Sequence, residues 1–82
     1  MKHAGKDALD ALEALLLQIR RHDDLTEKKR GIFYRNSAAF LHFHEDPKGL
    51  FADLRVGSVW KRFRVSTKTE CKALLAQLQA IL

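Results

Sequence analysis

Two short turns in the middle of this chain constrain its fold more than any other feature. Gly57-Ser58 lies between Val56 and Val59, and a Gly-Ser pair between β-branched residues is typical of a type II′ hairpin turn. Counting outward from this turn pairs Val56 with Val59, Leu54 with Lys61, Ala52 with Phe63 and Leu50 with Val65. One face of the hairpin is therefore apolar except at Lys61, which indicates that it lies against a core.

The other face of this hairpin carries charged and aromatic side chains. On it Arg55 lies opposite Trp60, Asp53 opposite Arg62, and Phe51 opposite Arg64. Side chains directly opposite one another on two strands interact, so we expect two cation–π contacts and one ion pair on this face.

A second hairpin is predicted around Asn36-Ser37, whose small polar residues favour a tight turn. In this register Tyr34 opposes Ala39, Phe33 opposes Phe40 and Ile32 opposes Leu41. Period-two alternation then directs Ile32, Tyr34, Ala39, Leu41 and Phe43 inward, and Phe33, Arg35, Phe40, His42 and His44 outward.

The connection between the two hairpins, Glu45–Gly49, contains Asp-Pro and Gly, which are strong turn signals. Two phasings of this connection keep the core faces of both hairpins together, with His44 level with either Gly49 or Phe51. The second of these phasings sets His42 beside Asp53.

Helical patterns flank the strands on both sides. Leu9, Leu12, Leu16 and Ile19 recur at helical spacing, and basic residues at 20–22 predict a helix over about residues 6–22. Thr67-Lys68-Thr69-Glu70 is a capping box that begins a second helix running to the end of the chain. We therefore expect an α+β fold in one domain, residues 1–82, with a four-stranded antiparallel meander and both helices packed on one face.

The remaining segments carry little pattern. Residues 22–30 are expected to be irregular, with Lys28-Lys29-Arg30 guarding a sheet edge, and Lys2, His3 and Lys6 to form a frayed end. The apolar run Ala14–Leu17 is too short to span a bilayer, and no signal-peptide pattern is present, so we expect a cytoplasmic protein without a membrane segment. Cys71 is the only cysteine, which excludes an internal disulfide.

The outward side of the predicted sheet, which we call the open face, is the candidate functional surface. Its members are Phe33, Phe40, His42, His44, Phe51, Asp53, Arg55, Trp60, Arg62 and Arg64. An exposed aromatic patch of this size is typical of an interface, so we expect a non-enzymatic interaction module that forms a homodimer through this face. The alternative is binding of single-stranded nucleic acid or another anionic ligand, because the aromatic residues are interleaved with arginines and the formal net charge is +5.

The histidines of the open face suggest two further chemistries. His42 and His44 share one side of a strand and, with Asp53 or Asp46, could hold a metal ion. Two histidines without a third His or Cys do not form a motif, so we expect no metal ion and no cofactor. His42 oriented by Asp53 would resemble part of a catalytic triad, but the available serines lie at hairpin tips, so we expect no catalytic residue.

The centre of the chain resembles small, uncharacterised bacterial proteins. The shared pattern is FLHFHEDP…GLFADLR, which spans residues 40–55, and the resemblance extends over most of the chain from about Leu25 onward. It implies a bacterial cytoplasmic protein, and no activity or catalytic residue comes with it.

Overall fold

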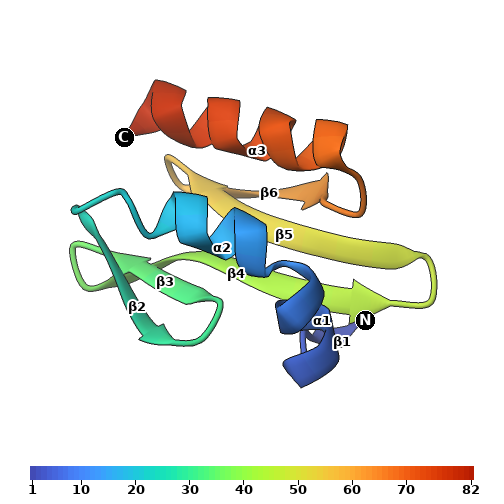
Figure 1. The fold of residues 1–82 in the computed structure, drawn as a ribbon. Coiled ribbons are helices and arrows are strands. Elements are labelled where there is room, and N and C mark those ends of the chain that lie inside the picture. The colour runs from blue at the N-terminus through green and yellow to red at the C-terminus, as the bar shows by residue number, and fades with distance from the viewer.

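The computed structural model describes residues 1–82 and is an α+β fold with an antiparallel sheet and helices at both ends of the chain (Figure 1). The helices are α1 (Lys6–Ala11), α2 (Glu13–Ile19) and α3 (Lys68–Ile81). The strands are β1 (Lys2–His3), β2 (Leu25–Lys29), β3 (Ile32–Arg35), β4 (Ala38–Asp46), β5 (Gly49–Val56) and β6 (Val59–Arg64). None of the helices has the length and apolar composition that crossing a bilayer requires.

The sheet is larger than the four strands predicted from the sequence. Its order is β2-β3-β4-β5-β6, and β1 pairs with the end of β4 that β3 does not reach. Both additional strands come from segments that we expected to be irregular or frayed, so those expectations are wrong. Neither has a readable pattern, because β1 contains two residues and β2 is a polar edge strand in which only Leu25 is strongly apolar.

Gly31 joins β2 to β3 at a place where an added side chain would displace that of Leu9. Its φ is +79°, and a Cβ built on it would lie 2.6 Å from Cδ2 of Leu9. The close approach lets the β2–β3 turn sit directly against α1, which closes this side of the core.

The β5–β6 hairpin has the register predicted from the sequence. Every pair from Phe51 opposite Arg64 to Val56 opposite Val59 is present. Gly57 has a φ of +64° while Ser58 does not lie in the left-handed region, which agrees with a type II′ turn. The Thr67–Glu70 capping box at the start of α3 is also confirmed, with both reciprocal hydrogen bonds formed.

The β3–β4 hairpin departs from its predicted register one residue beyond the turn. Tyr34 lies opposite Ala39 as expected, but the register then shifts and Phe33 lies opposite Leu41 instead of Phe40. The extra residue in β4 forms a bulge, which rotates β3 relative to the expected alternation. Phe33 and Phe40 are consequently buried in the core, so their assignment to the open face is wrong, as is the inward assignment of Ile32 and Tyr34.

The connection between the hairpins adopts the second of the two predicted phasings. β4 continues to Asp46 and β5 begins at Gly49, so that only Pro47-Lys48 forms the turn. His44 lies opposite Phe51 and His42 opposite Asp53, which keeps Leu41 and Phe43 on the core face.

The N-terminal helix is shorter than predicted and is broken at Leu12. The φ and ψ of Leu12 are −94° and 2°, and its amide donates to both Ala8 and Leu9. The helix ends at Ile19, so Arg20 lies outside it and forms ion pairs with Glu13 and Glu27 at 2.6 Å. These contacts tie the helix to strand β2.

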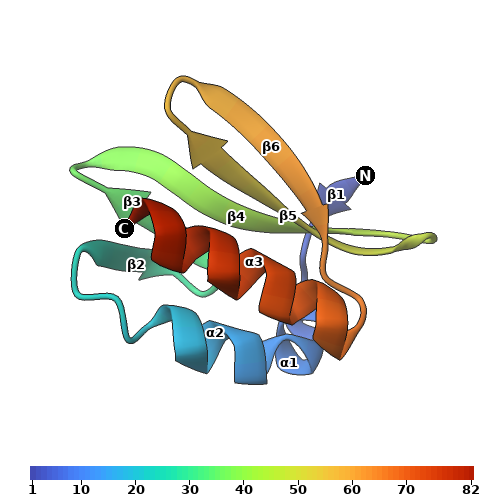
Figure 2. The ribbon, with the colours of Figure 1, turned by 90° about the horizontal axis from the view of Figure 1, so that it is seen from above.

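All three helices lie on the same side of the sheet, where α2 and α3 run next to each other (Figure 2). Between this layer and the sheet lies a single cluster of 14 buried side chains. Its members include Leu12, Leu16, Ile19, Phe33, Leu41, Phe43, Leu54, Val65, Leu74 and Leu78. Phe63, on the hairpin face expected to lie against the core, is only partly covered at the periphery of this cluster.

Candidate metal centre on the open face

The side of the sheet opposite the helices keeps eight of the ten residues assigned to it. They are His42, His44, Phe51, Asp53, Arg55, Trp60, Arg62 and Arg64. The bulge exchanges Phe33 and Phe40 for Ile32 and Tyr34 on this side, so its large aromatic side chains are Tyr34, Phe51 and Trp60. Histidines and arginines lie among them.

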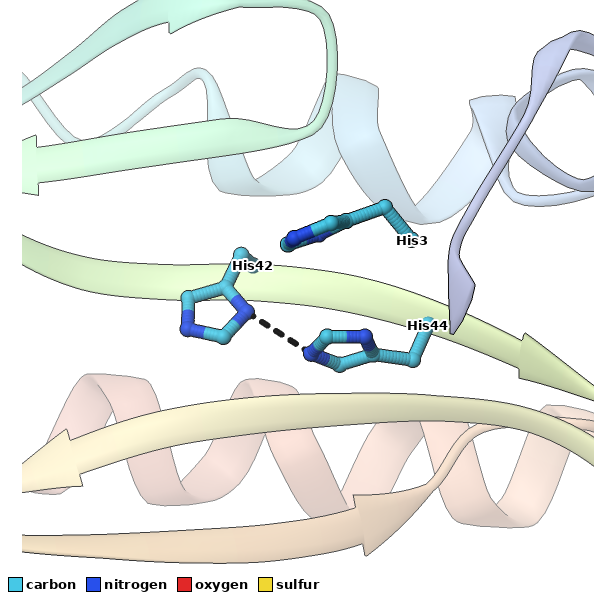
Figure 3. A group of neighbouring side chains, drawn as sticks. All are labelled: His3, His42 and His44. Atoms are coloured by element: carbon cyan, nitrogen blue, oxygen red, sulfur yellow. Dashed lines mark hydrogen bonds between the residues drawn. The ribbon is translucent and has the colours of Figure 1, made fainter. Parts of the chain in front are cut away.

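Three histidines meet on this face, and we call them the histidine cluster: His3, His42 and His44 (Figure 3). His42 and His44 stand two residues apart on β4, and β1 pairs with β4 so that His3 lies opposite His44. The rings of His3 and His44 stack at 4.8 Å between centroids, while His42 meets His44 edge-on at 4.9 Å. The Nδ1 atom of His42 is 3.0 Å from Nε2 of His44.

Sequence reasoning missed His3 because a two-residue strand has no periodicity that would show its pairing. The structure shows what holds it in place. The Ala4 amide donates to the carbonyl of Phe43 at 3.0 Å, and the Gly5 amide donates to the Glu45 carboxylate at 2.7 Å. The hydrogen bond from Gly5 lowers the pKa of Glu45, so this carboxylate is ionised and anchors the N-terminal segment to β4.

Asp53 joins the histidine cluster to the arginines of the open face. Its carboxylate accepts two hydrogen bonds from Arg62, at 2.7 and 2.9 Å, which confirms the predicted ion pair. Its Oδ2 atom is also 3.1 Å from Nε2 of His44. The hydrogen bonds from Arg62 lower the pKa of Asp53 despite partial burial, so the group is a carboxylate at neutral pH.

His42 is in the neutral form, which can bind a metal ion. Partial burial lowers its pKa, and the neighbouring His44 lowers it further. His42 is therefore neutral at pH 7, with a lone pair on one ring nitrogen. The Nδ1 atom of His44 is buried without a hydrogen-bond partner, so the contacts at Nε2 alone orient that ring.

The predicted pairs between arginine and aromatic side chains are absent. Trp60 packs against the ring of His42 at 4.9 Å instead of against Arg55. Arg64 reaches Glu70 and the carbonyl of Lys48. The cations that do lie over aromatic rings are Lys28 over Tyr34 and Arg35 over Phe40.

The spacing of the histidine cluster is close to that of a metal site. Each of the three side chains offers a ring nitrogen, and these atoms lie within 4.8 Å of one another. Two nitrogens bound to one tetrahedral Zn²⁺ at 2.0–2.1 Å are separated by about 3.3–3.4 Å. His42 and His44 already approach this separation, and His3, which offers the third nitrogen, is exposed.

None of the three cavities of the structure is lined by His3, His42, His44 or Asp53. The cluster therefore lies on an open surface and not at the base of a pocket. This position suits an ion or a broad partner surface better than an enclosed small substrate.

Comparison with known proteins adds no relatives: no protein-family model, no curated protein and no solved structure matches this chain.

Proposed function

We propose that this protein binds a divalent transition-metal ion of the Zn²⁺ type through His3, His42 and His44. The observation that carries the proposal is the convergence of three ring nitrogens within 4.8 Å, from two strands that are far apart in the sequence. Imidazole is a preferred ligand for Zn²⁺, Cu²⁺ and Ni²⁺, whereas Mg²⁺ and Ca²⁺ prefer oxygen ligands.

Asp53 supports the same site in one of two ways. Its Oδ2 atom is 3.1 Å from Nε2 of His44, which is near the separation of two ligands on one ion, so it is placed to act as a fourth ligand. Alternatively, it stays with Arg62 and its negative charge offsets part of the charge of the bound ion. In both arrangements Asp53 counteracts the repulsion that Arg62 would exert on a cation.

The test is calorimetric titration of the protein, without an affinity tag, with Zn²⁺ at pH 7. We expect one site per chain, and a loss of affinity of about 100-fold or more in His3→Ala and in His44→Ala, because each removes a ligand. His22→Ala is the matched control, since His22 is the fourth histidine of the chain and lies outside the cluster. Unchanged binding in His3→Ala, or an equal loss in His22→Ala, would refute the proposal.

A second candidate function is self-association through the open face. It is supported by Trp60, which lies on the open face of the edge strand β6 and is 43% exposed. An exposed aromatic side chain of this size favours a protein interface. Because Trp60 also packs against the ring of His42, this contact would adjoin the histidine cluster.

A further inference from the structure

The two hairpins separate at one end of the sheet. Pairing between β4 and β5 begins at Leu41 and Leu54, so the residues of β4 before Leu41 have no partner on β5. Figure 2 shows the β3–β4 and β5–β6 tips diverging beyond this point. A cavity of about 300 Å³ lies between the tips, and its lining includes Arg35, Phe40, Arg55 and Gly57.

The charge of this cavity is entirely positive. Arg35 and Arg55 are its only charged lining residues, and no acidic side chain reaches it. The chain has seven arginines, of which Arg20, Arg30, Arg62 and Arg64 form ion pairs with carboxylates. Of the three arginines without such a partner, two converge on this one cavity, which concentrates uncompensated charge there.

The packing of Arg35 leaves its hydrogen-bonding capacity free. Its guanidinium lies 5.7 Å from the ring of Phe40, and Phe40 is buried, so the ring restricts where the guanidinium can move. A guanidinium keeps its five N–H donors in its own plane, and the arginine side chains that donate hydrogen bonds in this structure are Arg20, Arg30, Arg62 and Arg64. Both are therefore available to a ligand.

We propose that this cavity binds a phosphate group, held between Arg35 and Arg55. Two arginine forks match the charge and the several acceptor oxygens of a phosphate monoester better than they match a single carboxylate. A volume of about 300 Å³ exceeds what a bare ion requires, so the group is expected to be part of a small organic phosphate. Trp60 lies directly opposite Arg55 and is exposed, but it does not line the cavity, so it is a candidate contact only for a ring that extends beyond the phosphate.

The test is a titration of ¹⁵N-labelled protein with inorganic phosphate, in which the amide chemical shifts are measured by NMR. The ionic strength is kept low, and a chelator keeps metal ions off the histidine cluster. We expect saturable shifts confined to the two hairpin tips. Arg35→Gln and Arg55→Gln should each weaken binding about tenfold, because each removes a charge-assisted pair of hydrogen bonds. Arg21→Gln is the matched control, since Arg21 also lacks a carboxylate partner but lies outside the cavity.

Two further ligands distinguish the source of the phosphate. Adenosine 5′-monophosphate and O-phosphoserine share the group, and only the first has a planar ring. If the parent binds the nucleotide more tightly than phosphoserine, and Trp60→Leu binds both equally, the ligand is a nucleotide. If the parent already binds both equally, the ligand is a phosphorylated side chain or metabolite. Shifts that do not saturate, or that survive both glutamine substitutions in protein whose amide spectrum remains folded, would overturn the site.

Discussion

His44 is the residue on which the histidine cluster depends. Its Nε2 atom lies 3.0 Å from His42 and 3.1 Å from Asp53, and its ring stacks on His3. It therefore touches both other members of the cluster and the carboxylate that links them to Arg62. No other side chain of the open face has contacts in all of these directions.

Among single residues, Gly31 provides a direct test of local packing. Gly31→Ala should destabilise the protein by ~2–3 kcal/mol, because the new Cβ would meet the Leu9 side chain in a left-handed conformation. Gly57→Ala is the control: its φ of +64° is also left-handed, but nothing lies within 4 Å of the new atom, so about 1 kcal/mol is expected. Urea titration measures both, and equal losses would mean that Leu9 does not press on the β2–β3 turn.

Among the elements, the bulge in β4 has the largest consequence. One extra residue places Phe33 in the core at 1% exposure, where regular pairing would have turned it to the open face. The same shift brings Ile32 opposite His42. The composition of the open face is thus set by a single irregularity in one strand.

The bulged register predicts different losses of stability for substitutions of two phenylalanines that the sequence assigned to the same face. Phe33→Ala should destabilise the protein by about 3–5 kcal/mol, because it opens a cavity in the core. Phe51→Ala should have a much smaller effect, below about 1.5 kcal/mol, because Phe51 is only partly covered on the open face. Equal losses in urea titration would contradict the bulged register.

The contacts between the helices and β2 predict a dependence of stability on pH. Partial burial tends to raise the pKa of Glu27, but hydrogen bonds from Arg20 and the Gly31 amide outweigh it and hold the pKa below its ordinary value of 4.5. A carboxyl whose pKa is lowered by folding stabilises the protein above its unfolded pKa, and this stabilisation disappears as the pH falls through its folded pKa. We expect the free energy of unfolding to begin falling near pH 4.5 and to continue falling below it.

Glu27→Gln separates this contribution from that of the other carboxylates. The variant should be less stable than the parent at pH 7. It should also lose less stability on acidification, because it lacks the carboxyl whose pKa folding lowers. Urea titrations at several pH values between about 3 and 7 measure the difference. A parent and variant that lose stability in parallel would show that the Arg20 ion pair does not link folding to pH.

At the scale of the whole molecule, the helices cover one face of the sheet and leave the other uncovered (Figure 2). The proposed metal site lies at the β1 end of that face, and the proposed phosphate cavity lies between the hairpin tips. Trp60 is associated with both, since it packs against His42 and lies opposite Arg55.

If the protein self-associates through this face, a charge introduced at Trp60 should dissociate the dimer. The parent should sediment as a dimer, and Trp60→Glu as a folded monomer, because the substitution places an unpaired charge in an apolar contact. Leu17→Glu is the control, since Leu17 is 56% exposed on α2, on the helical side of the molecule. A parent that sediments as a monomer, or a dimer that persists in Trp60→Glu, would exclude the interface.

The β5–β6 hairpin, the capping box of α3 and the ion pair between Asp53 and Arg62 were all predictable from the sequence. These features depend on residues close together in the chain, where turn chemistry and period-two alternation specify which side chains meet. The inward placement of Leu41 and Phe43 followed from the same alternation.

The remaining parts of the candidate sites depend on pairing between distant segments, which the sequence pattern does not show. β1 and β2 form because the edges of β4 and β3 offer unpaired backbone groups, and such pairing depends little on the sequence of the added strand. The bulge buries Phe33 and Phe40 in place of Ile32 and Tyr34, and two phenylalanine rings are more apolar than an isoleucine and a tyrosine with its polar hydroxyl. His3 joins His42 and His44 because β1 pairs with the edge of β4. A strand of two residues has no sequence pattern, so only this pairing locates it.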